Sequence, residues 1–118
     1  MRVSKENDVI RLQHMLEAAA KAQMMGEGQT RESLETDEMR LLAIAQLLTI
    51  IGEAASKVTI ERQQQFTQIP WSQIISMRNR LIHGYFEIDL DIVVDTLDSN
   101  LPTLITMLND AIGELNQR

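Results

Sequence analysis

The spacing of apolar side chains along the chain predicts four helices. From about Ser4 to Met25, apolar residues recur at steps of three and four, which is the period of one face of an amphipathic helix. The residues expected to face inward in this first helix are Val9, Leu12, Leu16, Ala19 and Ala20. Residues 26–30 then interrupt the pattern with two glycines, which indicates a loop.

The second predicted helix runs from a cap at Ser33 or Thr36 to about Lys57. Its centre, residues 41–51, carries apolar side chains on nearly every face. Such a helix has to be covered on all sides, and a small bundle offers few elements to do so. We therefore expect a second copy of the chain to cover part of it, which makes the protein a homodimer. Complete coverage by neighbouring helices of the same chain is the alternative.

The third helix is predicted to follow a short connection formed by the polar, glutamine-rich residues 61–68. Pro70 suits its first position, because the N–H that proline lacks would have no partner there. The residues expected to face inward are Trp71, Ile74 or Ile75, and Ile82. Gly84 is a natural stop for this helix.

The fourth helix should begin at a cap formed by Asp89 or Asp91. Its apolar stripe consists of Val93, Leu97, Leu101, Leu104, Leu108, Ile112 and Leu115. Pro102 lies inside this stripe and should bend the helix by removing one backbone hydrogen bond. Short connections between amphipathic helices predict an all-α antiparallel bundle of four to five helices, in a single domain covering residues 1–118.

Composition indicates where such a bundle would work. The chain has 118 residues, enough for one core, and no cysteine, so it has neither a disulfide framework nor a thiolate metal site. Its N-terminus lacks the apolar segment of a signal peptide, and the longest mainly apolar run, Leu41 to Ile51, is too short to span a bilayer. These features predict a cytoplasmic protein without a membrane partner.

Charge is distributed unevenly along this acidic chain. The net charge is −6, but residues 62–86 contain Arg62, Arg78 and Arg80 and no acid. An acidic protein with one basic segment should repel bulk nucleic acid and accept only a local phosphate contact. The alternative is that two arginines near a helix C-terminus complement the helix dipole, and the charge pattern taken alone favours this second interpretation.

Candidate chemistry is concentrated between Arg78 and Tyr85. This stretch supplies two guanidiniums, one amide, one imidazole and one phenol, which are groups that can hold a phosphodiester and move a proton. On a regular helix, five steps would rotate Arg78 about 140° away from His83. The two could converge if the helix ends before His83, or if they meet across a dimer axis. The only other histidine, His14, is interpreted as structural.

A two-fold dimer would suit RNA cleavage by attack of the 2′-hydroxyl. Two copies of His83 could accept one proton and donate another, while arginines stabilise the charged phosphate, and no metal is required. The alternative is that His83 complements the helix dipole and Tyr85 packs on the bundle. Glu53 is explained best as bracing the core or interface with an arginine, and Arg80 and Glu53 are also candidates for a supporting, RNA-binding role.

The pattern R-N-x-x-x-H-x-Y, formed by Arg78, Asn79, His83 and Tyr85, resembles the signature of the HEPN superfamily. With the flanking segments Ile51-Gly52-Glu53-Ala54, Ile69-Pro70-Trp71, Ile88-Asp89 and Leu101-Pro102, it is most similar to the HepT branch, whose members are ribonuclease toxins paired with MntA-type minimal nucleotidyltransferase antitoxins. The resemblance covers nearly the whole chain.

That resemblance implies a homodimeric bundle with metal-independent endoribonuclease activity and no cofactor. His83 would transfer protons, Arg78 would stabilise the scissile phosphate, and Asn79 would orient His83 or the substrate. The cognate nucleotidyltransferase would silence the toxin by transferring AMP to Tyr85. The competing interpretations are a non-catalytic helical subunit that binds a nucleotidyltransferase, and a plain structural dimer.

Overall fold

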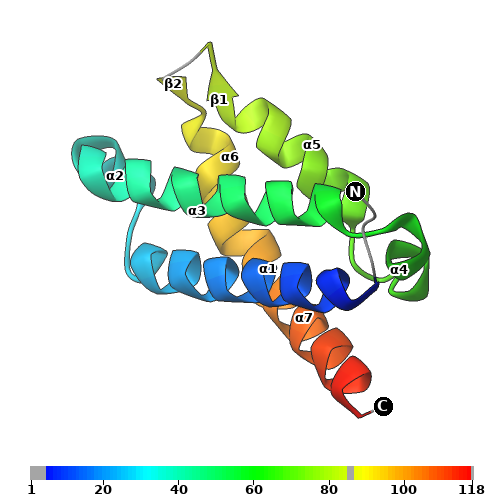
Figure 1. The fold of residues 1–118 in the computed structure, drawn as a ribbon. Helices are drawn as coiled ribbons and strands as arrows, with labels where there is room; N and C mark the ends of the chain where they lie inside the picture. The colour runs from blue at the N-terminus through cyan, green and yellow to red at the C-terminus, as the bar shows by residue number, and fades with distance from the viewer. Residues whose placement is uncertain (1–4, 85–86, 118) are drawn as a thin grey trace.

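The computed structural model describes residues 5–84 and 87–117, and this part of the chain is helical apart from one short hairpin. Helix α3 (Glu38–Lys57) packs against α1 (Lys5–Gly26) on one side and α5 (Trp71–Leu81) on the other, while α7 (Leu101–Asn116) crosses behind α1 (Figure 1). The predicted all-α bundle is confirmed.

The remaining elements are short and connect these four helices. They are α2 (Arg31–Thr36), α4 (Ile60–Gln65), strands β1 (Ile82–His83) and β2 (Glu87–Ile88), α6 (Leu90–Asp95) and a π-helical turn, η1 (Thr96–Asn100).

The core is aliphatic and lies between α1, α3, α5 and α7. Its largest fully buried side chains are Leu12, Met15, Leu34, Ile44, Leu48, Ile51, Leu81, Val93, Leu101 and Leu108. The apolar stripe predicted for the last helix is confirmed, since its seven members are buried or packed against the core. In α1 the prediction was partly wrong, because Ala20 is exposed while Met15, Ala18 and Ala22 are buried.

Two predicted boundaries in the first half were wrong. The second helix is split at Asp37, whose side chain accepts a hydrogen bond from the Arg40 N–H (3.1 Å) and caps α3. Thr30 is the N-cap of α2, with Ser33 as its capping-box partner, so neither Ser33 nor Thr36 is an N-cap. The glutamine-rich connection contains α4, because glutamine is a good helix former and Thr59 caps its first turn.

The fourth predicted helix is present, but in three parts. Asp89 is its cap, as one of the two predicted alternatives, and accepts a hydrogen bond from the Ile92 N–H (3.2 Å). The chain then widens into η1 directly before α7, which has Pro102 in its first turn. Proline cannot donate the N–H that a continuous α-helix would need there, and its ring would collide with a preceding carbonyl.

The hairpin was not predicted, and it changes the end of α5. This helix ends at Leu81, so Gly84 does not stop it and Ile82 is exposed rather than inward-facing. Gly84 instead adopts a φ of 64° after β1, a conformation that glycine adopts without strain. Ile82 pairs with Ile88, and His83 pairs with Glu87. The hairpin carries His83 away from the helix axis.

Helix α3 is long and apolar enough, by length and composition, to cross a membrane, a property that many core helices share. The helix is longer than the apolar run Leu41 to Ile51 on which the sequence expectation rested, since it includes the flanking residues from Glu38 to Lys57. Here α3 is the central helix of the bundle, packed on both sides.

Candidate active site

His83 contacts the carboxylate of Asp89, the residue directly after β2. Its Nε2 lies 3.0 Å from Asp89 Oδ2, and the Asp89 N–H donates to the Leu81 carbonyl (2.7 Å), which closes the hairpin. Asp89 therefore has two functions: one carboxylate oxygen caps α6 and the other receives the imidazole. The sequence indicated the capping function only, because the hairpin that brings His83 to it was not predicted.

This contact fixes which imidazole nitrogen is available for chemistry. Two hydrogen bonds lower the pKa of Asp89 below its ordinary value: the bond with His83 has the larger effect and the bond from the Ile92 N–H the smaller. The Asp89 carboxyl group is therefore ionised at neutral pH. A carboxylate can only accept hydrogen bonds, and His83 Nε2 must therefore carry the hydrogen. Nδ1 is then the nitrogen that can take or give a proton to a substrate.

Arg78 lies where α5 packs closely against Gly52 of α3. A side chain at Gly52 would place its Cβ 2.4 Å from the Arg78 Cβ, so only glycine permits this contact. The Arg78 Nη1 lies 3.8 Å from Glu53 Oε1, and its Nε and Nη2 donate to Asn79 Oδ1 at 3.2 and 2.9 Å. Glu53 is half-exposed rather than buried, but its partner is an arginine, as its position suggested.

The structure separates the candidate residues into two groups in one chain. Arg78, Asn79 and Glu53 form one connected group, and His83 with Asp89 forms another. Asn79 contacts Arg78 and not His83 in this arrangement. No hydrogen bond or ion pair joins the two groups in the described part of the chain.

The remaining candidates lie apart from these groups. Arg80 is exposed and lines a hollow beside α6 and η1, because two steps along a helix rotate it about 200° from Arg78. His14 is exposed on α1. Tyr85 falls outside the described residues. Within the described residues, no three His, Asp or Glu side chains cluster as metal ligands would.

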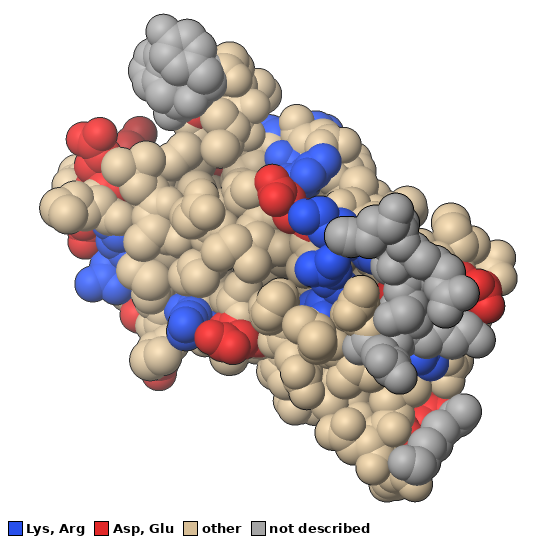
Figure 2. All heavy atoms as spheres, viewed as in Figure 1, with Lys and Arg blue, Asp and Glu red and all other residues tan. Residues whose placement is uncertain are grey.

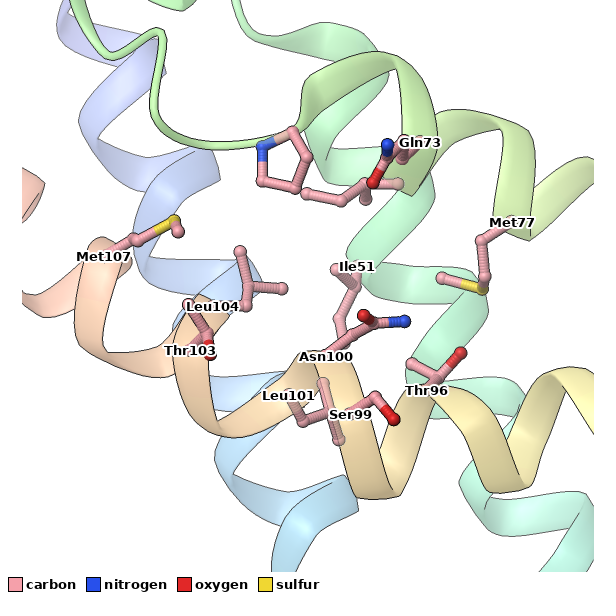
Figure 3. A pocket seen from close by; sticks show the side chains of 12 residues that line it. Ile51, Gln73, Met77, Thr96, Ser99, Asn100, Leu101, Thr103, Leu104 and Met107 are labelled. Carbon is pink, nitrogen blue, oxygen red and sulfur yellow. The ribbon is translucent and has the colours of Figure 1, made fainter.

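A separate groove of about 200 Å³ lies between α5 and η1 (Figure 3). Its inner wall is apolar, with Ile51, Met77 and Leu104, and Gln73 and Asn100 stand at its rim. Thr96, in the widened turn, uses its hydroxyl to bond the Ile92 carbonyl (2.7 Å). The groove contains none of the candidate site residues named from the sequence, namely Glu53, Arg78, Asn79, Arg80 and His83.

Comparison with known proteins identifies related chains. A family model described as "Ribonuclease HepT-like" matches residues 15–111. A Thermococcus cleftensis protein named "Probable ribonuclease HepT" is 32% identical over 73 residues, which cover 62% of this chain and 66% of that protein. A protein of Caldanaerobacter subterraneus subsp. tengcongensis, assigned as an RNase, is 30% identical over 93 residues, covering 79% of this chain and 83% of the relative.

A longer relative from Methanocaldococcus jannaschii is 27% identical over 108 residues, and its name combines gamma-glutamylcyclotransferase with an RNase assignment. The match covers 92% of this chain but only 49% of that relative, so the chain spans about half its length. No solved structure matches the chain significantly.

Proposed function

Because the chain belongs to the HepT-like ribonuclease family, we propose that it is an endoribonuclease that cleaves RNA without a metal ion. The observation that carries the proposal is the His83–Asp89 pair, which leaves one imidazole nitrogen free for proton transfer. Arg78 would stabilise charge on the scissile phosphate, and its long contact to Glu53 is weak enough for a phosphate to replace it. Asn79 would hold the Arg78 side chain in place for that phosphate.

The proposed active form is a homodimer, because one chain offers a single His83 while cleavage needs both a proton acceptor and a proton donor. An exposed apolar strip on α3 supports this form: Met39, Leu42 and Ile50 are 83%, 49% and 37% exposed and lie on one side of the helix. Much of the surface over α3 and α1 in Figure 2 carries no charge. Glu53, with Arg78 beside it, continues the same side of α3.

The function is tested with purified, unmodified protein and a pool of RNAs in the presence of EDTA. We expect cleavage, with products that carry a 5′-hydroxyl because the 2′-hydroxyl is the nucleophile. A folded, dimeric sample that leaves every RNA intact would instead favour a non-catalytic subunit that binds a nucleotidyltransferase.

The dimer is tested by placing charge on the apolar strip. The double substitution Leu42→Glu and Ile50→Glu should convert the dimer to a monomer in analytical ultracentrifugation and abolish cleavage, because four carboxylates would be buried unpaired at the interface. Helicity should remain, since both side chains are exposed in the single chain. The matched control is Ile60→Glu, because Ile60 is 67% exposed on α4 and lies away from the strip. A wild-type protein that sediments as a monomer while cleaving RNA would rule out the dimeric site.

We further propose that a cognate minimal nucleotidyltransferase of the antitoxin class regulates the protein in the cytoplasm. Co-expression should add AMP units to the intact mass, relieve the slow growth caused by the toxin alone, and fail to modify Tyr85→Phe. An adduct carries negative charge two residues from His83, where it would compete for the arginines that bind RNA. Tyr85 is the only tyrosine in the chain, so AMP found on another residue would contradict this mechanism.

A further inference from the structure

The cationic side chains of this acidic protein fall into two sets. Among the described residues, Lys21, Arg31, Arg40 and Arg62 each pair with an acidic residue, namely Glu17, Asp91, Asp37 and Asp8, and Arg78 makes the longer contact to Glu53. Arg11, Lys57 and Arg80 have no ion-pair partner in the described part of the chain. An unpaired cation keeps its full charge for an external anion.

Two of the unpaired cations, Lys57 and Arg11, lie level with the last turns of α3, against which Arg78 packs at Gly52. Lys57 is four residues after Glu53, so it stands one turn further along the same side of α3 as the acid that contacts Arg78. The position of Arg11 follows from how α1 is aligned along α3. Asp8 bonds the Thr59 N–H and hydroxyl at 2.9 and 2.6 Å, while His14 and Ile50 line one small hollow, so Arg11 lies level with the last turns of α3.

Figure 2 shows the result as a band of basic side chains over α5, α3 and the first half of α1. We define the basic band as Arg78, Lys57 and Arg11. Neighbouring helix axes lie roughly 8–10 Å apart, so a band across three helices extends about 16–20 Å. The Arg11 Nε is buried without a hydrogen-bond partner in the described part of the chain, so a phosphate contact of Arg11 falls to its outer guanidinium nitrogens.

We propose that the basic band is the path of the RNA backbone away from the scissile phosphate, with Lys57 and Arg11 binding successive phosphates. This inference rests on the proposed ribonuclease function and adds the substrate-binding surface to it. Cationic side chains on neighbouring helices suit phosphates, which carry charge but no sequence information. The band favours single-stranded RNA, because the net charge of −6 would repel the denser phosphate charge of a duplex.

The experiment measures binding of a fluorescein-labelled 20-nucleotide single-stranded RNA by anisotropy, on a His83→Ala background that removes cleavage. Lys57→Gln and Arg11→Gln should each weaken binding about fivefold and reduce the slope of log K against log salt by roughly 0.7. Lys21→Gln is the matched control, since it removes the same charge from α1 but from a paired side chain, and it should change neither quantity. Lys57 is exposed, so its variant should fold even if Arg11→Gln does not.

Cleavage kinetics separate this inference from the proposed function. In otherwise wild-type protein, Lys57→Gln should raise KM for the 20-nucleotide RNA and leave kcat unchanged, because Lys57 contacts no reacting atom. Unchanged affinity and salt slope in both variants would overturn the basic band, even if the protein cleaves RNA. If the variants bind RNA more weakly but the wild-type protein never cleaves RNA, the basic band is supported and the nuclease function is rejected. If an acidic protein binds the band and RNA does not, the band is a protein interface and the proposal is wrong.

Discussion

Replacing His83 with alanine is expected to reduce the single-turnover rate of RNA cleavage by about 10²- to 10⁴-fold, the usual contribution of a positioned acid–base group. The imidazole is the only group of its kind in the candidate site, and Asp89 leaves its Nδ1 available. The side chain is exposed, so its removal should change the free energy of unfolding by less than about 0.5 kcal/mol. Rates are measured with RNA at saturating enzyme, alongside urea unfolding of the same sample.

Two further variants separate chemistry from structure. His14→Ala removes the other histidine, which is exposed on α1, and should cleave at the wild-type rate. Asp89→Asn keeps an oxygen for the α6 cap but removes the carboxylate that fixes the His83 hydrogen on Nε2, so we expect a loss of roughly 10- to 100-fold. Because Asp89 acts through His83, its substitution should add little to His83→Ala. Full activity of His83→Ala would remove the basis of the proposed mechanism.

The sequence predicted most of the fold because its hydrophobic periodicity is strong. The stripe from Val93 to Leu115 determines which side of the last helix is buried, and the apolar centre of α3 marks it as the central helix of the bundle. Boundaries were harder, because they depend on single side chains. Asp37 ends α2 through its backbone N–H, which donates to the Leu34 carbonyl, and begins α3 through its carboxylate. Aspartate is also common in loops and on exposed surfaces, so the residue type alone does not mark such a boundary.

The sequence names candidate site residues but does not determine their geometry. Arg78, Asn79 and His83 stand out in the sequence as candidate groups, but their arrangement depends on where α5 ends. Leu81 is the last helical residue because the chain turns into a two-residue strand, and strands that short carry no alternating pattern. The pairing of His83 with Asp89 follows from the hairpin register, which the sequence does not display.

The buried acid Asp8 was also missed, and its importance follows only from tertiary contacts. It lies on the inner side of α1 with no exposed surface, in a polar segment that looked like an ordinary solvated helix start. Its oxygens receive the Thr59 N–H and hydroxyl, and Arg62 Nε lies 3.7 Å away with a side chain only 12% exposed. The contact joins the start of α1 to the start of α4.

Asp8→Ala is therefore expected to lower the free energy of unfolding by about 3 kcal/mol, because it removes a buried charge partner and two hydrogen bonds at once. Urea unfolding followed by circular dichroism measures the loss. Asp8→Asn retains one acceptor oxygen, so its free energy of unfolding should fall by roughly half as much as that of Asp8→Ala. Asp110→Ala, which removes an exposed carboxylate from α7, should lie within about 0.5 kcal/mol of wild type.

The same substitution connects stability to the proposed RNA path. Asp8 and Thr59 fix the register that places Arg11 level with the end of α3, so loss of this contact should also weaken RNA binding at a temperature where the protein is still folded. Asp8→Asn, which keeps part of the contact, should bind RNA more tightly than Asp8→Ala. If Asp8→Ala unfolds at the wild-type urea concentration, the buried network contributes nothing to stability, and the register of α1 must be determined by its apolar contacts alone.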